Sequence, residues 1–202
     1  SRLAAHLPAL HDLAGERAAA PDLARPIPHE PPPQSLDVDA ALAARVYDGL
    51  RVTLDSSPSS VIQALVDSGE RGRGGAAYPT GVKWRQCAEA RAPRKYVVAN
   101  GDEGDPGSFI DRVLMEFDPH TILEGMAIAA FAVGASEGIV FVRSEYPRAA
   151  EAMRDAIQEA VSANLLGADV LGRGFDFHVR VFTAMGSYVC GEETAMLNAI
   201  EG

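Results

Sequence analysis

Apolar residues follow two spacings along this chain, and the two alternate from Ser57 onward. A helix is predicted from Ser57 to Gly69, because a serine cap and a proline precede apolar residues at helical spacing and a glycine follows them. Apolar or alternating runs typical of strands occupy residues 95–99, 139–142 and 175–182. Further helical patterns cover residues 119–135, 147–163 and 192–200.

Strands that alternate with helices predict an α/β layered fold. The sheet is expected to be mostly parallel, with a place for one antiparallel strand. Parallel strands bring their carboxyl ends to one edge of the sheet, and ligands of such folds bind there. The loops that follow the predicted strands are therefore the first places to look for chemistry.

The first 36 residues have a different character. Six prolines stand between Pro21 and Pro33, and proline both removes a backbone donor and disfavours helix. The leucines at positions 3, 7, 10 and 13 are spaced as in a short amphipathic helix. We therefore divide the chain into an N-terminal segment with an extended, Pro-rich linker (residues 1–36) and one α/β domain (residues 37–202).

Composition narrows the class of function. The 202 residues are 47% hydrophobic, enough for a substantial core, and no run of about eighteen apolar residues predicts a membrane span. With 28 acidic and 18 basic residues, the chain lacks the basic footprint of a nucleic-acid-binding protein. Cys87 and Cys190 are too few for a disulfide framework, which favours a reducing, cytoplasmic compartment.

Glycines and cations gather in one segment of this acidic chain, RGRGGAAYPTGVKW (residues 71–84). The segment follows a predicted helix, so a dinucleotide fingerprint is out of context, and the lysine spacing does not fit a Walker loop. Gly72, Gly74 and Gly75 lack a Cβ, so backbone N–H groups can approach an anion, and Lys83 adds charge near a helix start. The segment predicts a phosphate cradle; the alternative is a flexible surface loop with solvated arginines.

An acidic turn, NGDEGDPG (residues 100–107), directly follows the predicted strand 95–99. Carboxylates accept hydrogen bonds from sugar hydroxyls and ring N–H groups but repel phosphate. Next to a phosphate cradle they therefore indicate a nucleotide or a flavin. Two alternatives remain: carboxylates that cap a helix beginning near Ser108, and a calcium loop of closely spaced oxygens.

A third loop, GSYVCGEET (residues 186–194), again stands between a predicted strand and a predicted helix. Glu192 and Glu193 would favour the helix dipole, so helix stabilisation is the alternative to ligand binding here. Cys190 is interpreted as a small buried hydrophobe. Tyr188 is either a core residue or a platform for ring stacking.

Together the three loops resemble those of one family. The segments are RGRGGAAYPTGVKW, then NGDEGDPGSFIDR with DPH at 118–120 and EGM at 124–126, then YVCGEETAMLNAIEG. The chain is similar to the flavin-binding, NADH-oxidising subunit shared by respiratory complex I, NAD-reducing hydrogenases and NAD-dependent formate dehydrogenases. The resemblance covers residues 41–202 and implies a Rossmann-like layered domain in which FMN takes a hydride from NADH and electrons leave singly through iron–sulfur clusters.

The resemblance assigns roles to individual loop residues. Those expected to hold FMN are Gly72, Arg73, Gly74, Gly75, Lys83, Asn100, Asp102, Glu103, Tyr188, Gly191, Glu192 and Glu193. Those expected near NAD(H) are Tyr78, Asp105 and Glu193; Tyr78 stands where the family usually has a phenylalanine, and Asp105 where many complex I members have a glutamate. No catalytic acid or base and no metal ligand is assigned, because the flavin accepts the hydride.

The sequence motif GDEGDPGSF favours a soluble formate dehydrogenase or hydrogenase complex. The alternatives are the NADH-dehydrogenase subunit of complex I, at the cytoplasmic face of the membrane, and a non-catalytic domain that binds calcium or a partner. The resemblance implies NADH or NAD+ and iron–sulfur subunits as partners, with no nucleic acid and no direct membrane insertion. Because Cys87 and Cys190 lack the companions of a four-cysteine cluster, a [4Fe–4S] cluster is expected in a part of the natural chain that follows Gly202.

Overall fold

A computed structural model describes residues 35–73, 76–104, 107–184 and 193–201 of the chain. The linker and the leucine pattern of residues 1–34 lie outside this part. In chain order the helices and strands are α2 (Val38–Ala43), α3 (Asp48–Leu54), α4 (Pro58–Ser68), α5 (Thr80–Glu89), β1 (Tyr96–Gly101), α6 (Ile110–Phe117), α7 (Pro119–Val133), β2 (Glu137–Arg143), α8 (Pro147–Ser162), a short 3-10 helix (Val170–Gly172), β3 (His178–Ala184) and α9 (Glu193–Glu201).

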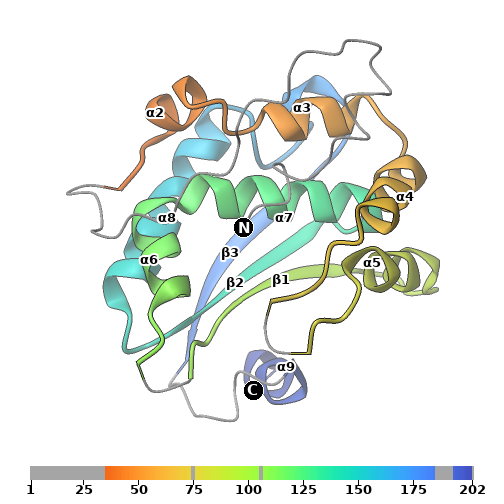
Figure 1. Cartoon of the computed structure of the whole chain (residues 1–202). Coiled ribbons are helices and arrows are strands. Elements are labelled where there is room, and N and C mark those ends of the chain that lie inside the picture. The colour runs from red at the N-terminus through yellow and green to blue at the C-terminus, as the bar shows by residue number, and fades with distance from the viewer. Residues whose placement is uncertain (1–34, 74–75, 105–106, 185–192, 202) are drawn as a thin grey trace.

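The three described strands form one parallel sheet in the order β1-β2-β3. Because this order follows the chain, right-handed crossovers place all the connecting helices on one face of the sheet. Figure 1 shows α6, α7 and α8 together on that side, and α9 on the other. The predicted α/β fold with a parallel sheet is confirmed, and within the described residues no antiparallel strand joins the sheet.

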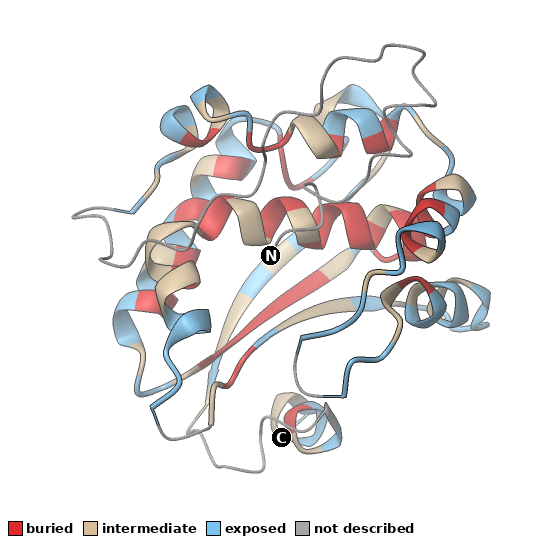
Figure 2. Cartoon of the chain, viewed as in Figure 1, coloured by how far each residue is buried: buried red, intermediate tan, exposed pale blue. Residues whose placement is uncertain are grey.

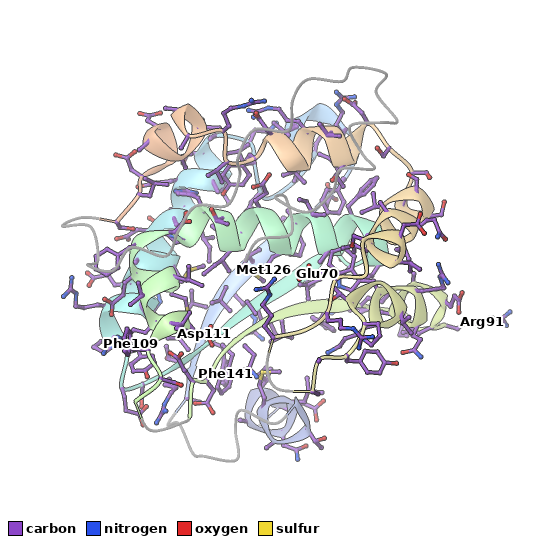
Figure 3. All side chains as sticks on the ribbon, in the orientation of Figure 1. Glu70, Arg91, Phe109, Asp111, Met126 and Phe141 are labelled. Carbon is purple, nitrogen blue, oxygen red and sulfur yellow. The ribbon has the colours of Figure 1, made fainter. Side chains whose placement is uncertain are left out.

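Two faces of β2 explain this layering. Val140 and Val142 point into the core that contains α7 and α8, whereas Phe141, between them, packs with Met196 of α9. Figure 3 shows Phe141 on the side of the sheet where α9 lies. A strand covered on both faces reads as a continuous apolar run, which accounts for the uninterrupted apolar residues 139–142.

Helix α7 is the centre of the core and is buried along most of its length (Figure 2). It ends where Gly134 takes a positive φ of 75°, the backbone conformation that closes many helices. Helix α4 forms as its sequence predicts, with a capping box at Ser57 and Gly69 in the left-handed region. None of the described helices is long and apolar enough to cross a bilayer.

The third predicted strand, residues 175–182, is displaced in the structure. It begins at His178, and Phe177 instead makes an isolated bridge with Gly167. Phe175 packs edge-on against Phe131 of α7, with 5.6 Å between the ring centroids. The alternation of apolar and polar residues at 175–177 therefore comes from a connecting segment that packs against the core, not from a strand.

Candidate functional site

The glycine segment forms a loop whose base is closed by backbone hydrogen bonds. The N–H of Gly72 donates to the carbonyl of Tyr78 over 2.9 Å, and the N–H of Thr80 donates to the carbonyl of Glu70 over 2.9 Å. The Arg71 guanidinium donates to the carbonyl of Ala77, also over 2.9 Å. Gly74 and Gly75, at the tip, lie outside the described residues. The Gly72 N–H is thus used inside the loop, and an added Cβ would make ordinary van der Waals contact with the Tyr78 backbone at 3.7 Å, the nearest described atom.

Helix α5 begins at the end of this loop and carries Lys83 one turn in, on an exposed face. Gly81 allows α5 to pack against α4, because a Cβ there would lie 2.6 Å from the backbone nitrogen of Val66. Arg73 is exposed and stands 3.8 Å from Glu70. Tyr78 is also exposed, and its hydroxyl donates to Gln86 over 3.2 Å.

The acidic turn starts at the carboxyl end of β1, as the edge rule for parallel sheets predicts. Gly101 lies so close to β2 that a Cβ would come within 2.7 Å of the Phe141 carbonyl oxygen. The side-chain oxygen of Asn100 accepts from the N–H of Asp102 over 3.0 Å, which fixes the turn. Asp105 lies outside the described residues.

The two described carboxylates of this turn do different things. Glu103 accepts from the first backbone N–H groups of α6, at 2.7 Å from Ile110 and 3.2 Å from Asp111. Figure 3 shows Phe109 and Asp111 at this helix start. The capping alternative thus holds for Glu103, while Asp102 points inward and is buried. Among the described residues no three His, Cys, Asp or Glu side chains gather in a group that could hold a metal ion.

Asp102 lies next to Arg143, the last residue of β2. The Arg143 Nε lies 3.4 Å from Asp102 Oδ1, yet neither that nitrogen nor either Asp102 oxygen has a hydrogen-bond partner in the described part of the chain. Burial raises the pKa of Asp102; the nearby Arg143 lowers it and Glu145 raises it, and the balance is upward. A buried carboxyl that accepts no hydrogen bond is costly unless a donor from outside these residues supplies one.

Arg143 was missed by the sequence reasoning. Its Nη1 donates to the carbonyl of Glu103 over 2.8 Å and its Nη2 faces the Glu145 carboxylate at 3.2 Å. The available signal was its place as the first charged residue after the apolar run 139–142, at the edge where ligands bind.

The third loop follows β3, whose carboxyl end lies at the same edge of the sheet because the three strands are parallel. Strand β3 ends at Ala184 and α9 begins at Glu193. Tyr188, Gly191 and Glu192 lie outside the described residues, and of Glu193 only the backbone is described. Met196 anchors α9 beneath the sheet. A glycine loop with a cation and a buried carboxylate at a strand end are the kinds of group that suit a ligand with a phosphate at one end and polar ring or sugar groups at the other.

Comparison with known families assigns the chain, with this edge of the sheet, to a family. The model of the Nuo51 FMN-binding domain family matches residues 65–202. The chain belongs to this family. The match begins within α4 and includes the glycine loop, the acidic turn and α9.

Relatives in the Nuo51 FMN-binding family come from two kinds of enzyme. The chain is 45% identical over 165 residues to the NADP-reducing hydrogenase subunit HndC of Solidesulfovibrio fructosivorans, covering 82% of this chain and 34% of the relative. It is 46% identical over 158 residues to an NADH-quinone oxidoreductase subunit of Escherichia coli (strain K12), covering 77% and 36%. The chain thus spans about a third of the length of these relatives.

A solved structure supports the fold assignment. The chain is similar to a crystal structure of an NAD+-reducing [NiFe]-hydrogenase in the air-oxidized state, with a TM-score of 0.63 and 36% sequence identity. The similarity covers 74% of this chain and 24% of the hydrogenase chain. The Nuo51 FMN-binding family therefore accounts for the fold and for the three loops together.

The DPH and EGM motifs of the family resemblance lie on α7 and at its N-cap, Asp118. His120 and Glu124 are buried there, and the Glu124 carboxylate accepts from the N–H of Leu50 over 3.1 Å. His120 lies between Tyr47 and Glu159. These motif residues hold α3 and α8 against α7, so their role in the described structure is architectural.

Proposed function

We propose that this chain binds FMN at the carboxyl ends of β1 and β2 and forms the NADH-oxidising module of a multi-subunit redox enzyme. The observation that carries the proposal is the buried Asp102 carboxyl, whose two oxygens have no hydrogen-bond partner among the described residues. A ribityl hydroxyl or a flavin ring N–H is a donor of the required kind. Membership of the Nuo51 FMN-binding domain family supports this assignment.

The described residues divide the work of binding in a way that fits FMN. Lys83 and Arg73 lie on the side of the glycine loop and would meet the phosphate, whereas Asp102 and Asn100 would meet the ribityl chain or ring. Gly72, which has no Cβ, would allow close approach of a ligand to its Cα. Gly74, Gly75, Tyr188, Gly191, Glu192 and Glu193 are proposed to complete the pocket, and Tyr78 and Asp105 to contact NAD(H).

When bound, FMN would accept a hydride from NADH and release the electrons singly. The chain's own part is to orient the two ring systems, to keep water away and to fix the charge beside the flavin. No side chain is assigned to proton transfer. The exposed Tyr78, whose hydroxyl donates to Gln86, is proposed to pack its ring against the nucleotide.

For the parent enzyme we propose a soluble, cytoplasmic hydrogenase or formate dehydrogenase complex, because of the sequence motif GDEGDPGSF. Relatives in hydrogenases and in NADH-quinone oxidoreductases keep the complex I subunit as the second candidate. In either case the natural chain is proposed to carry a [4Fe–4S] cluster outside residues 1–202, with iron–sulfur partner subunits.

The test uses the natural full-length polypeptide, purified with its partner subunits. The complex is denatured, and the supernatant is analysed for flavin by chromatography and absorption. One FMN per chain is expected. A flavin-free supernatant from a complex that oxidises NADH would overturn the assignment. Assays with hydrogen, formate and quinone as the second substrate then distinguish the parent enzymes.

A further inference from the structure

The guanidinium of Arg143 is held on three sides. Its Nη1 donates to the Glu103 carbonyl over 2.8 Å, its Nη2 faces Glu145 at 3.2 Å, and its carbon centre lies 5.7 Å from the ring centroid of Tyr146. A planar guanidinium presents its donors in a rigid fork and can stack on a ring, whereas a lysine ammonium is a compact point charge on a flexible stem. The side chain is therefore fixed in one place at the end of β2.

The sheet register decides what lies on its fourth side. Gly101 of β1 pairs with Val142 of β2, so Asp102 and Arg143 are the next residues along two adjacent parallel strands. The Nε edge of Arg143 faces Asp102 Oδ1 at 3.4 Å, and the Asp102 side chain is fully buried. Both groups keep unused hydrogen-bonding capacity among the described residues.

This arrangement separates two tasks. The two outer nitrogens of Arg143 donate hydrogen bonds to the Glu103 carbonyl and to Glu145. Its positive charge lies beside Asp102, but it makes no hydrogen bond to the Asp102 oxygens. The oxygens stay available for a ligand. We propose that Arg143 is a positioning residue of the flavin site, which fixes the Asp102–Glu103 turn and places a positive charge beside the Asp102 carboxyl that would bond FMN.

The proposal rests on the proposed function and extends it to a residue outside the three loops. Within the described part of the chain, the charged groups that act on Asp102 are Arg143 and Glu145, while the Glu103 carboxylate is engaged at the start of α6. Burial and Glu145 favour the protonated form of Asp102, and Arg143 alone among these groups opposes it. Loss of the guanidinium should therefore let Asp102 take up a proton at higher pH.

The experiment measures FMN affinity against pH in the natural complex, stripped of flavin and titrated with FMN while flavin fluorescence is followed. Arg143→Gln is expected to weaken binding by about ten- to a hundredfold near neutral pH. It should also shift the acid loss of binding to higher pH. Arg143→Lys, which keeps a charge but loses the fork, should weaken binding less and leave the pH of that loss near the wild-type value.

Two further variants separate positioning from simple folding. Arg112→Gln removes the other guanidinium that stacks on Tyr146, at 5.5 Å, and should leave FMN affinity unchanged. In an Asp102→Asn background, where no carboxyl remains beside the guanidinium, Arg143→Gln should have a much smaller effect than in wild type. This background also accounts for titration of the FMN phosphate itself.

The results distinguish a failure of FMN binding from a failure of the role of Arg143. Wild-type complex that binds no FMN overturns the proposed function. Wild-type complex that binds FMN, with Arg143→Gln equal to it at every pH, overturns the positioning role alone. So do equal losses in Arg143→Gln and Arg143→Lys with an unchanged pH profile, or effects of Arg143→Gln and Asp102→Asn that simply add.

Discussion

The Tyr47 hydroxyl lies 2.9 Å from Nδ1 of His120, a residue 73 positions further along the chain. Both side chains are fully buried, and Nε2 of the same imidazole lies 3.1 Å from a Glu159 carboxylate oxygen. Burial, with Glu124, Glu159 and Asp118 nearby, raises the pKa of Tyr47, so its hydroxyl stays protonated and donates the hydrogen bond to His120. In the neutral ring Nδ1 is then the acceptor, and Nε2–H donates to Glu159.

Tyr47→Phe should therefore destabilise the fold. The change keeps the ring but leaves Nδ1 of His120 buried without a donor, which costs about 1–3 kcal/mol. Chemical denaturation followed by circular dichroism would measure the free energy of unfolding. The matched control is Tyr96→Phe, because Tyr96 is exposed and its loss of a hydroxyl should change stability by less than about 0.5 kcal/mol. Equal stability of the two variants would contradict this role for His120.

The buried Glu124 predicts a pH dependence of stability. Burial raises its pKa above the ordinary 4.5, although backbone N–H groups of Tyr47, Leu50 and Gly49 pull the other way. A carboxyl with a raised pKa in the folded state contributes stability below its unfolded pKa, and this contribution is lost as pH rises through the folded value. Glu124→Gln removes that loss.

The measurement compares unfolding free energies of wild type and Glu124→Gln between about pH 4 and pH 7.5. The stability of wild type relative to the variant should fall as pH rises. Glu151→Gln, on the exposed face of α8, is the control and should follow wild type at all pH values. A difference that grows in the opposite direction would mean that the backbone hydrogen bonds outweigh burial.

The sequence predicted the layers better than the contacts. Apolar runs at 95–99 and 139–142 identified β1 and β2, because a strand covered on both faces needs such a run. The capping pattern around Ser57 and Gly69 identified α4 for an equally local reason. By contrast, the short helices α2 and α3 were not predicted, since each has too few turns to show a clear periodicity, and α6 was expected only as the helix near Ser108 in the capping alternative.

The candidate site was only partly predictable from sequence. Loop composition indicated anion and polar-ligand contacts, and Asp102 lies at the strand end where such contacts were expected. The role of Arg143 depends on the register between β1 and β2, which is a long-range property that no local pattern encodes. In the same way, Glu103 could be a ligand or a cap on sequence grounds, and only its distance to the α6 amides shows the cap.

Lys83 offers a direct test of the phosphate cradle. A charge-assisted contact is worth about 1.5–3 kcal/mol, so Lys83→Ala should weaken FMN binding by roughly ten- to a hundredfold or more. Flavin content after extensive dialysis of the natural complex measures this. Arg85→Ala is the matched control, because Arg85 lies two residues further on the same helix and donates to Gln63 of α4. If both variants keep their flavin, the surface-loop alternative for residues 71–84 is favoured.

Alanine substitutions at two glycines of the same region, Gly72 and Gly81, should have different effects on stability. Among the described residues, an alanine Cβ at Gly72 would meet only the backbone of Tyr78, at 3.7 Å, so Gly72→Ala should change the free energy of unfolding by less than about 0.5 kcal/mol. The methyl group would nevertheless stand where a ligand approaches the loop. FMN affinity should therefore fall although the fold is intact.

Gly81→Ala should do the reverse. Its Cβ would lie 2.6 Å from the nitrogen and 2.9 Å from the Cα of Val66, and neither backbone atom can move without separating α4 from α5. Overpacking of this kind costs about 1–3 kcal/mol, which denaturation would detect. Because α5 carries Lys83, FMN affinity should fall in step with stability. Stability and flavin affinity measured side by side thus distinguish a glycine kept for a ligand from one kept for packing; unchanged flavin affinity in Gly72→Ala would place the FMN away from this loop.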